Sequence, residues 1–303
     1  MHSNFLDFFR CLAFVFKMPS GLLVNSRFAV GNFIHETSVA AKVGCLVLCV
    51  FYLVSFVIDP LKILGITPGN LIPPNFWIWT IFTHQFIEVN CISLLFSCVV
   101  LVHSSQVLEP LWTLLGYLTF FGIVTIFSGL CSGICYLVCY MLTFNISYLF
   151  DVSLYGLCGY AAGYFVALKQ SRGDRMLVGS IGLYVMHLPL LYICAVLGLR
   201  IAGLLAGSYV IHVIWGTMIS WIYLRFYQSH SRGRGDNAEK FAFKTFFPSV
   251  IQTPVGILAD LIFNFLLKIK VCRKTTYKYD VGAPSKITIT LSGVHALDAE
   301  RRR

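Results

Sequence analysis

The residues that could do chemistry in this sequence are eleven cysteines, most of them inside apolar runs, and a few histidines and carboxylates. Two thiols bind zinc or exchange disulfides most readily when they are close together, as in a C-x-x-C pair, and no such pair occurs here. Cys131, Cys135 and Cys139 repeat at i, i+4 and i+8 and so share one helical face. We interpret them as small packing residues. We therefore expect no metal ion and no cofactor.

Four other polar residues interrupt or flank apolar segments. His84 is predicted to lie in a loop or at the membrane interface. His212 is predicted to face the interior of a helix bundle, because ionisable groups at membrane depth rarely face lipid. Glu88 and Glu109 flank one apolar run, and we expect them to anchor its loops rather than to transfer protons.

The elements that position these residues are predicted to be transmembrane helices. Hydrophobic residues make up 57% of the 303 residues and charged residues only 12%, against roughly 45–50% and 25% in soluble domains. The mean hydropathy is +0.78. This composition excludes a disordered chain, a soluble enzyme and a disulfide-stapled secreted module. The fold class indicated is an all-α polytopic membrane protein.

Six apolar runs are candidates to cross a hydrocarbon core, which takes about 20 helical residues. They cover Val43–Ile58, 87–107, 111–145, Val152–Leu168, Met176–Leu199 and Ile201–Leu224. The third run has no charged residue, so it forms either one long tilted helix or a helix followed by a re-entrant piece. Only Leu199-Arg200 separates the last two runs, which predicts a tight hairpin.

The domain organisation follows the charge. We predict an N-terminal cytosolic or interfacial arm at 1–39, a membrane domain at 40–226 and a basic cytosolic region at 227–303. Residues 225–303 carry fourteen Lys/Arg against six Asp/Glu, whereas residues 1–224 carry nine against seven. In the basic region we expect an amphipathic helix at 255–270 and a short β-like segment at 286–291.

The basic excess also predicts orientation and a partner. Lys and Arg in the 169–175 loop and after residue 224 indicate that both segments are cytosolic, which makes both termini cytosolic. An anionic lipid surface is the favoured partner; nucleic acid is the weaker reading, and a merely solvated tail is the alternative. The candidate membrane-surface residues are Arg225, Arg232, Arg234, Lys268 and Lys270.

Two small-x-x-x-small pairs predict where helices approach closely in lipid. They are Gly129 with Gly133 and Gly159 with Gly163. We expect these faces to pack helices and to support self-association.

Several motifs resemble a known family. Trp79-Thr-Ile-Phe-Thr-His84, Leu108-Glu-Pro110 and Gly156-Leu-Cys-Gly159 resemble the first loop, the second span and the G-x-S-G motif of rhomboid proteins, over roughly residues 43–226. Further runs, at 73–80, 148–150, 166–170, 224–228, 231–236 and 279–284, resemble the Golgi rhomboid-like family of transmembrane protein 115.

This resemblance implies a rhomboid-like six-helix bundle in the Golgi membrane. It implies a role in Golgi-to-ER retrograde vesicle transport, with an indirect effect on glycosylation. It also implies self-association and contact between the cytosolic tail and the conserved oligomeric Golgi tethering complex.

A working rhomboid needs a nucleophile, a base and donors for the oxyanion. The resemblance places Cys158 at the nucleophile. His212 and Gly216 form H-x-x-x-G where the family has H-x-x-G, so aligning on Gly216 places Val213 at the base. The remaining departures are Thr80 at the arginine of a loop Trp-Arg pair, and Ser93 and Ser97 at the oxyanion His and Asn.

These departures predict a rhomboid pseudoprotease and not an enzyme. The alternative is an active intramembrane protease that uses Cys158 with His212. A transporter ranks last, because no charged residue lies in the middle of a span and no internal repeat is visible.

Overall fold

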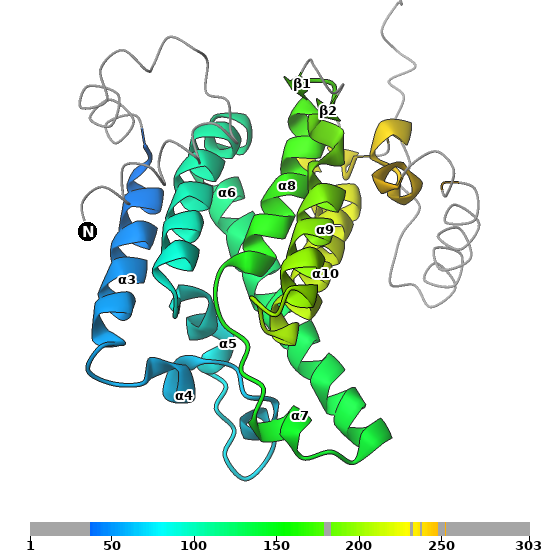
Figure 1. Cartoon of the computed structure of the whole chain (residues 1–303). Coiled ribbons are helices and arrows are strands. Elements are labelled where there is room, and N and C mark those ends of the chain that lie inside the picture. The colour runs from blue at the N-terminus through cyan, green and yellow to red at the C-terminus, as the bar shows by residue number, and fades with distance from the viewer. Residues whose placement is uncertain (1–36, 179–182, 231–232, 237, 248–251, 253–303) are drawn as a thin grey trace, which may run out of the picture.

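The computed structural model describes residues 37–178, 183–230, 233–236, 238–247 and 252. The predictions for residues 1–36, Arg232, 255–270, Lys268, Lys270 and 286–291 lie outside this part of the chain. The described part is mainly helical (Figure 1). Its longer helices are α3 (Val39–Val54), α6 (Cys91–Thr143), α8 (Cys158–Arg172), α9 (Leu188–Ile201) and α10 (Gly207–Ile222).

Short elements connect these helices. Between α3 and α6 lie α4 (Pro60–Leu64), η1 (Pro68–Leu71), α5 (Thr80–Thr83) and η2 (His84–Phe86); α7 (Ser147–Phe150) follows α6. Strands β1 (Met176–Val178) and β2 (Leu183–Tyr184) form one antiparallel pair, and β3 (Ser229–His230) and β4 (Gly233–Arg234) form another. Single turns complete the described chain: η3 (Val185–His187), η4 (Tyr223–Tyr227, π-helical), η5 (Glu239–Phe241) and η6 (Phe243–Phe246).

Helix α6 is bent back on itself near its middle. Thr113 has a non-helical backbone with φ 68° and ψ 162°, three residues after Pro110. Ser104 Oγ lies 3.2 Å from the hydroxyl of Tyr117, whereas thirteen residues of straight helix would separate them by roughly 20 Å. The two halves therefore run past each other. The 111–145 run is a continuous helix after this turn, as one of the two sequence alternatives proposed.

Three predicted helix starts are wrong. Helix α8 begins at Cys158 and not at residue 152, because Leu154 first pairs with Ile66 in a β-bridge and Gly156 has a φ of +86°. Residues 176–178 are a strand, and α9 starts only at Leu188, where Pro189 fits the first helical turn. The last hairpin turns at residues 202–206, so Arg200 lies inside α9.

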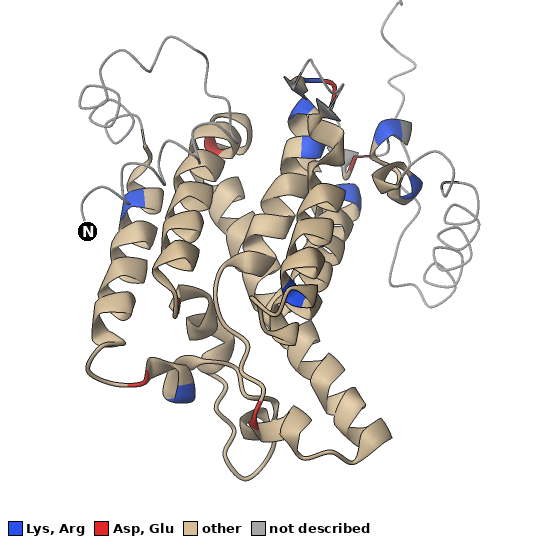
Figure 2. Cartoon of the chain, in the orientation of Figure 1, with Lys and Arg blue, Asp and Glu red and all other residues tan. Residues whose placement is uncertain are grey.

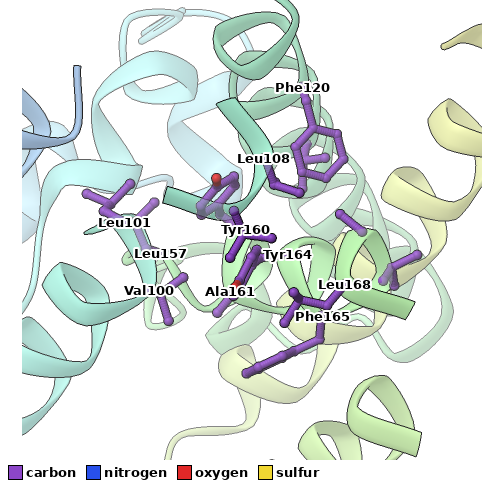
Figure 3. Packing of buried hydrophobic residues seen from close by; sticks show 14 of the residues in the cluster. Val100, Leu101, Leu108, Phe120, Leu157, Tyr160, Ala161, Tyr164, Phe165 and Leu168 are labelled. Atoms are coloured by element: carbon purple, nitrogen blue, oxygen red, sulfur yellow. The ribbon is translucent and has the colours of Figure 1, made fainter. Parts of the chain in front are cut away.

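The apolar core is centred on α8. Tyr160, Tyr164 and Phe120 are fully buried among aliphatic residues of α6 and α8 (Figure 3). The hydroxyl of Tyr160 donates to Ser104 Oγ over 2.9 Å, so the aromatic core satisfies its own polar group.

Helices α8 and α10 cross with their backbones in contact. A Cβ added to Gly216 would lie 2.7 Å from the carbonyl carbon of Gly159 and 2.8 Å from its Cα. Only glycine at this position allows such an approach, which is the small-residue packing expected between helices in lipid.

Large apolar side chains cover the outside of the helices. Exposed examples are Leu46, Leu115, Phe127, Leu142, Leu197 and Ile201. In the described part of the chain, α6 alone passes the length and hydropathy test for a membrane span, and α3 and residues Val185–Ile201 are shorter apolar helices. This surface suits lipid rather than water.

The residues after α10 fold back onto the bundle. We call residues 228–247 the return segment, of which 231–232 and 237 are not described. Lys169, only 5% exposed, donates to Thr245 Oγ over 2.9 Å and lies 3.6 Å from the ring centroid of Phe246. Trp221 Nε1 donates to the carbonyl of Phe241 over 3.1 Å. The return segment thus begins just after the boundary predicted at 226/227, yet it packs against the helices that precede this boundary.

The α8–α10 crossing generates a stability prediction. Gly216→Ala should lower the thermal unfolding temperature in detergent, because the methyl group pushes against backbone atoms and overpacking costs about 1–3 kcal/mol. Gly198→Ala in α9 is the matched control, because an added Cβ there meets nothing within 4 Å. The control should be neutral or slightly stabilising through helix propensity. Equal unfolding temperatures for the two variants would contradict the close crossing.

Candidate functional site

The carboxylate of Glu88 is the centre of a buried polar site. Glu88 is 1% exposed and lies between η2 and α6. Ser93 Oγ donates to its Oε2. Ser97 Oγ donates to its Oε1 over 2.6 Å, and the Leu157 amide donates to the same oxygen over 3.2 Å. Three donors from two elements therefore converge on one carboxylate.

The sequence positions of these three donors relate the site to the rhomboid resemblance. Ser93 and Ser97 stand at the positions that the rhomboid resemblance assigns to the oxyanion His and Asn. Leu157 immediately precedes Cys158, so its amide belongs to the segment that holds the nucleophile in that family. The groups that the resemblance assigns to the oxyanion donors are thus hydrogen-bonded to the chain's own Glu88 side chain.

Two histidines lie side by side near this site. His84 and His212 are buried, with ring centroids 5.5 Å apart. His84 Nδ1 lies 3.2 Å from the carbonyl oxygen of Thr80, which can only accept a hydrogen bond, so Nδ1 carries the proton. His212 Nε2 lies 3.0 Å from Ser128 Oγ. His84 begins the short helix η2 in the connection between α3 and α6, and its buried side chain reaches into the bundle and not to an interface.

The thiol of Cys158 lies in apolar and aromatic surroundings. Cys158 packs in one cluster with Ala162, Val196, Tyr209 and Val213. Val213 is the residue that alignment on Gly216 places at the base position, and it has no titratable group. His212, one residue earlier, is hydrogen-bonded to Ser128 instead. Cys158 and Val213 thus belong to the same apolar cluster.

The loop before α6 is held by neutral hydrogen bonds. Thr80, at the position of the family's arginine, is buried and its Oγ donates to the Trp77 carbonyl over 2.6 Å. Trp79 Nε1 donates to the Ile63 carbonyl over 3.1 Å. Thr80 thus braces the loop and offers no cation to a substrate.

The four predicted packing glycines are buried within one chain. A Cβ at Gly129 would lie 2.6 Å from His84 Nε2, and one at Gly159 would lie 2.6 Å from His212 Nε2. Gly163 faces Val124 and Ser220, and Gly133 faces Ile66 and Leu71. These glycines make room for the histidines and for neighbouring helices. Because the four glycines are buried by other parts of the same chain, their role within the chain is packing, and self-association through these faces stays a prediction.

Of the five predicted membrane-surface cations, Arg225 and Arg234 lie among the described residues, and the other three lie outside them. Arg225 Nη1 donates to the carbonyls of Asp236 and Ala238 over 2.7 and 2.8 Å, so this arginine ties the return segment to α10. The backbone of Arg234 lies in β4. Arg225 therefore has a structural task that the charge pattern did not predict.

The site offers little to an ion. Among the described residues, no group of three or more His, Cys, Asp or Glu could hold a metal ion. Its chemistry is hydrogen bonding between neutral side chains, backbone amides and one carboxylate. Ser128 and the burial of His84 were missed by sequence reasoning; the small residue Gly129 beside Ser128 was the available indication of space for a ring.

The apolar, mainly helical fold defines an all-α membrane protein. The family model described as "Eukaryotic integral membrane protein (DUF1751)" matches residues 42–303, and the chain belongs to this family. It is 44% identical to transmembrane protein 115 of Homo sapiens and of Mus musculus over 281 residues, 93% of this chain and 80% of each relative. It is 28% identical to rhomboid-like protein 19 of Arabidopsis thaliana over 261 residues, 85% of this chain and 83% of the relative. The resemblance drawn from the motifs is thereby confirmed.

The Glu88 site predicts a specific stability effect. Glu88→Gln should lower the thermal unfolding temperature in detergent more than Ser93→Ala does, because the new amide presents N–H groups to neighbours that are themselves donors. Hydrogen bonds to charged groups are worth about 1.5–3 kcal/mol each.

A double-mutant cycle of Glu88→Gln with Ser97→Ala should show coupling above roughly 0.5 kcal/mol, since the two groups are in contact. Strictly additive effects would contradict the shared network. Asp174→Asn is the control, because Asp174 makes an exposed ion pair with Lys240 and is expected to change stability little.

Proposed function

We propose that the protein is a non-catalytic membrane scaffold of the Golgi apparatus that acts in Golgi-to-ER retrograde vesicle transport and affects glycosylation indirectly. The observation that carries the non-catalytic part is the Glu88 carboxylate, which accepts from Ser93, Ser97 and the Leu157 amide. A tetrahedral oxyanion needs free donors at this place. The resident carboxyl group of Glu88 already occupies these donors.

The surroundings of Cys158 support the same proposal. A thiol becomes a nucleophile when a basic or cationic group favours its thiolate. Here Val213 and Tyr209 stand beside it. A protease that used Cys158 would need His212 to leave Ser128 and Glu88 to leave its three donors, so no observation favours that alternative.

The proposed topology has six spans. They are α3, the two halves of α6, α8, α9 and α10. Lys and Arg positions at the start of α3, at the end of α8 and in the return segment share one end of the bundle (Figure 2). Basic residues collect on the cytosolic side of membrane proteins. This end is therefore proposed to be cytosolic, with both termini.

The proposed partners follow from the surfaces that remain. The exposed apolar helices contact the bilayer, and the proposed self-association uses helix faces within it. The tethering complex of the Golgi is cytosolic, so its proposed contact lies in the chain beyond the return segment.

The non-catalytic proposal has a direct test. In cells that lack the protein, Cys158→Ala and His212→Ala should restore Golgi-to-ER retrieval of a reporter, provided that each variant is expressed at the wild-type level. Cys194→Ala, which removes an exposed thiol of α9, is the control for the loss of a cysteine. Failure of Cys158→Ala at normal expression, with Cys194→Ala active, would contradict the proposal and favour the protease alternative.

A second test separates the bundle from its tail. A chain ending after Gln252 should keep Golgi residence and thermal stability but lose binding to the tethering complex. A chain ending after Asp236 should in addition lose stability, because it removes Thr245 and Phe246 and leaves the buried Lys169 without these partners. Retained tether binding by the chain that ends after Gln252 would move the partner site to the exposed loops of the bundle.

A further inference from the structure

A cavity lies between the start of α3 and the kink of α6. Its volume is about 560 Å³ and it opens to the surface; the described residues that line it are Ser38, Ser105, Gln106, Glu109, Pro110 and Leu114. This size lies within the roughly 300–1,000 Å³ of sites that hold small molecules. Its walls combine hydroxyl groups, an amide and one carboxylate with two apolar residues.

Glu109 gives the cavity its charge. Its Oε2 is buried and has no hydrogen-bond partner. The ion pairs found in the described part of the chain involve Asp59 and Asp174, so no Lys or Arg there neutralises Glu109. A buried carboxylate oxygen without a donor is costly. The cavity therefore suits a cation that carries N–H groups.

Lys42 is an exposed cation one helical turn after Ser38, which lines the cavity. Its amide donates to the carbonyl of Ser38 over 3.1 Å, so Lys42 lies one helical turn after a lining residue. Helical side chains lean towards the N-terminus, which directs the exposed Lys42 side chain back over that turn. A ligand with an ammonium group and a nearby phosphate matches this pair of charges.

The cavity also borders a lipid-facing surface. Leu111, Leu114 and Leu115 lie on either side of the kink at Thr113 and are exposed. The kink near the middle of α6 lies at the same end of the molecule as the basic start of α3 (Figure 2). An acyl chain can therefore run along these leucines while its headgroup enters the cavity.

We propose that this cavity binds the phosphoethanolamine headgroup of a membrane lipid, with the ammonium group on Glu109 and the phosphate towards Lys42. The ammonium group of ethanolamine donates three hydrogen bonds, which Glu109 and the hydroxyls of Ser38 and Ser105 can accept. Choline has no N–H group. Serine adds a carboxylate that Glu109 repels. The inference goes beyond the scaffold function and does not depend on it.

The test uses the purified full chain in detergent and needs no variant for its first step. Phosphatidylethanolamine, phosphatidylcholine and phosphatidylserine of equal chain length are titrated separately, and bound lipid is counted by native mass spectrometry alongside the thermal unfolding temperature. Wild type should retain the ethanolamine lipid about tenfold better than the choline lipid and should be stabilised by it. Soluble phosphoethanolamine should bind far more weakly, because it lacks the chain that follows the leucines.

Variants then locate the site. Glu109→Gln should bring the ethanolamine-to-choline ratio close to one, and Glu109→Asp should reduce it in part. Asp174→Asn, a carboxylate removed elsewhere, should leave the ratio unchanged. Equal binding of the three lipids by wild type, a preference for the serine lipid, or a ratio unaffected by Glu109→Gln in a folded protein would overturn the proposal. Strong binding of soluble phosphoethanolamine would overturn the lipid as its source.

Discussion

The satisfaction of the Glu88 carboxylate is the constraint on which the arrangement of the bundle depends. A buried carboxylate without hydrogen bonds would cost several kcal/mol, and Glu88 receives three donors. Two come from the first turns of α6 and one from the start of α8. The hydrogen bonds of the Glu88 side chain therefore set the distance between the starts of α6 and α8. They also fix the position of Cys158, the first residue of α8.

The same junction explains why glycines stand where they do. The start of α8 carries Gly159, whose backbone touches Gly216 of α10 and whose missing side chain leaves room for His212. Gly129 of α6 leaves room for His84 in the same way. Gly129 and Gly159 therefore admit two imidazole rings to one polar layer inside the chain. That layer joins the segment before α6 to helices α6, α8 and α10.

The sequence predicted the helices well and their ends poorly. Long apolar runs identify membrane helices because the hydrocarbon core demands them. The break predicted at Glu109-Pro110, between the 87–107 and 111–145 runs, is found at Thr113, three residues after Pro110. The starts of α8 and α9 were misplaced, because an apolar run has no polar residue to mark where a loop or a strand ends and the helix begins. At the site, the departures at Cys158, Val213 and Thr80 could be named from the motifs. The contact of His84 with His212 could not, because it joins residues 128 positions apart through packing.

The charge pattern shows a related limit at the basic end of the bundle. A net excess of Lys and Arg after residue 224 reads as a cationic tail, yet several of these side chains and their neighbours are used in folding. Arg225 holds two carbonyls, Lys240 pairs with Asp174, and the buried Lys169 is covered by Thr245 and Phe246. Charge counted along a sequence does not distinguish a cation that is hydrogen-bonded inside a fold from one that is free for a partner. Since the described part of the return segment packs against the helices, the cations that hold it there cannot be counted as a free basic surface.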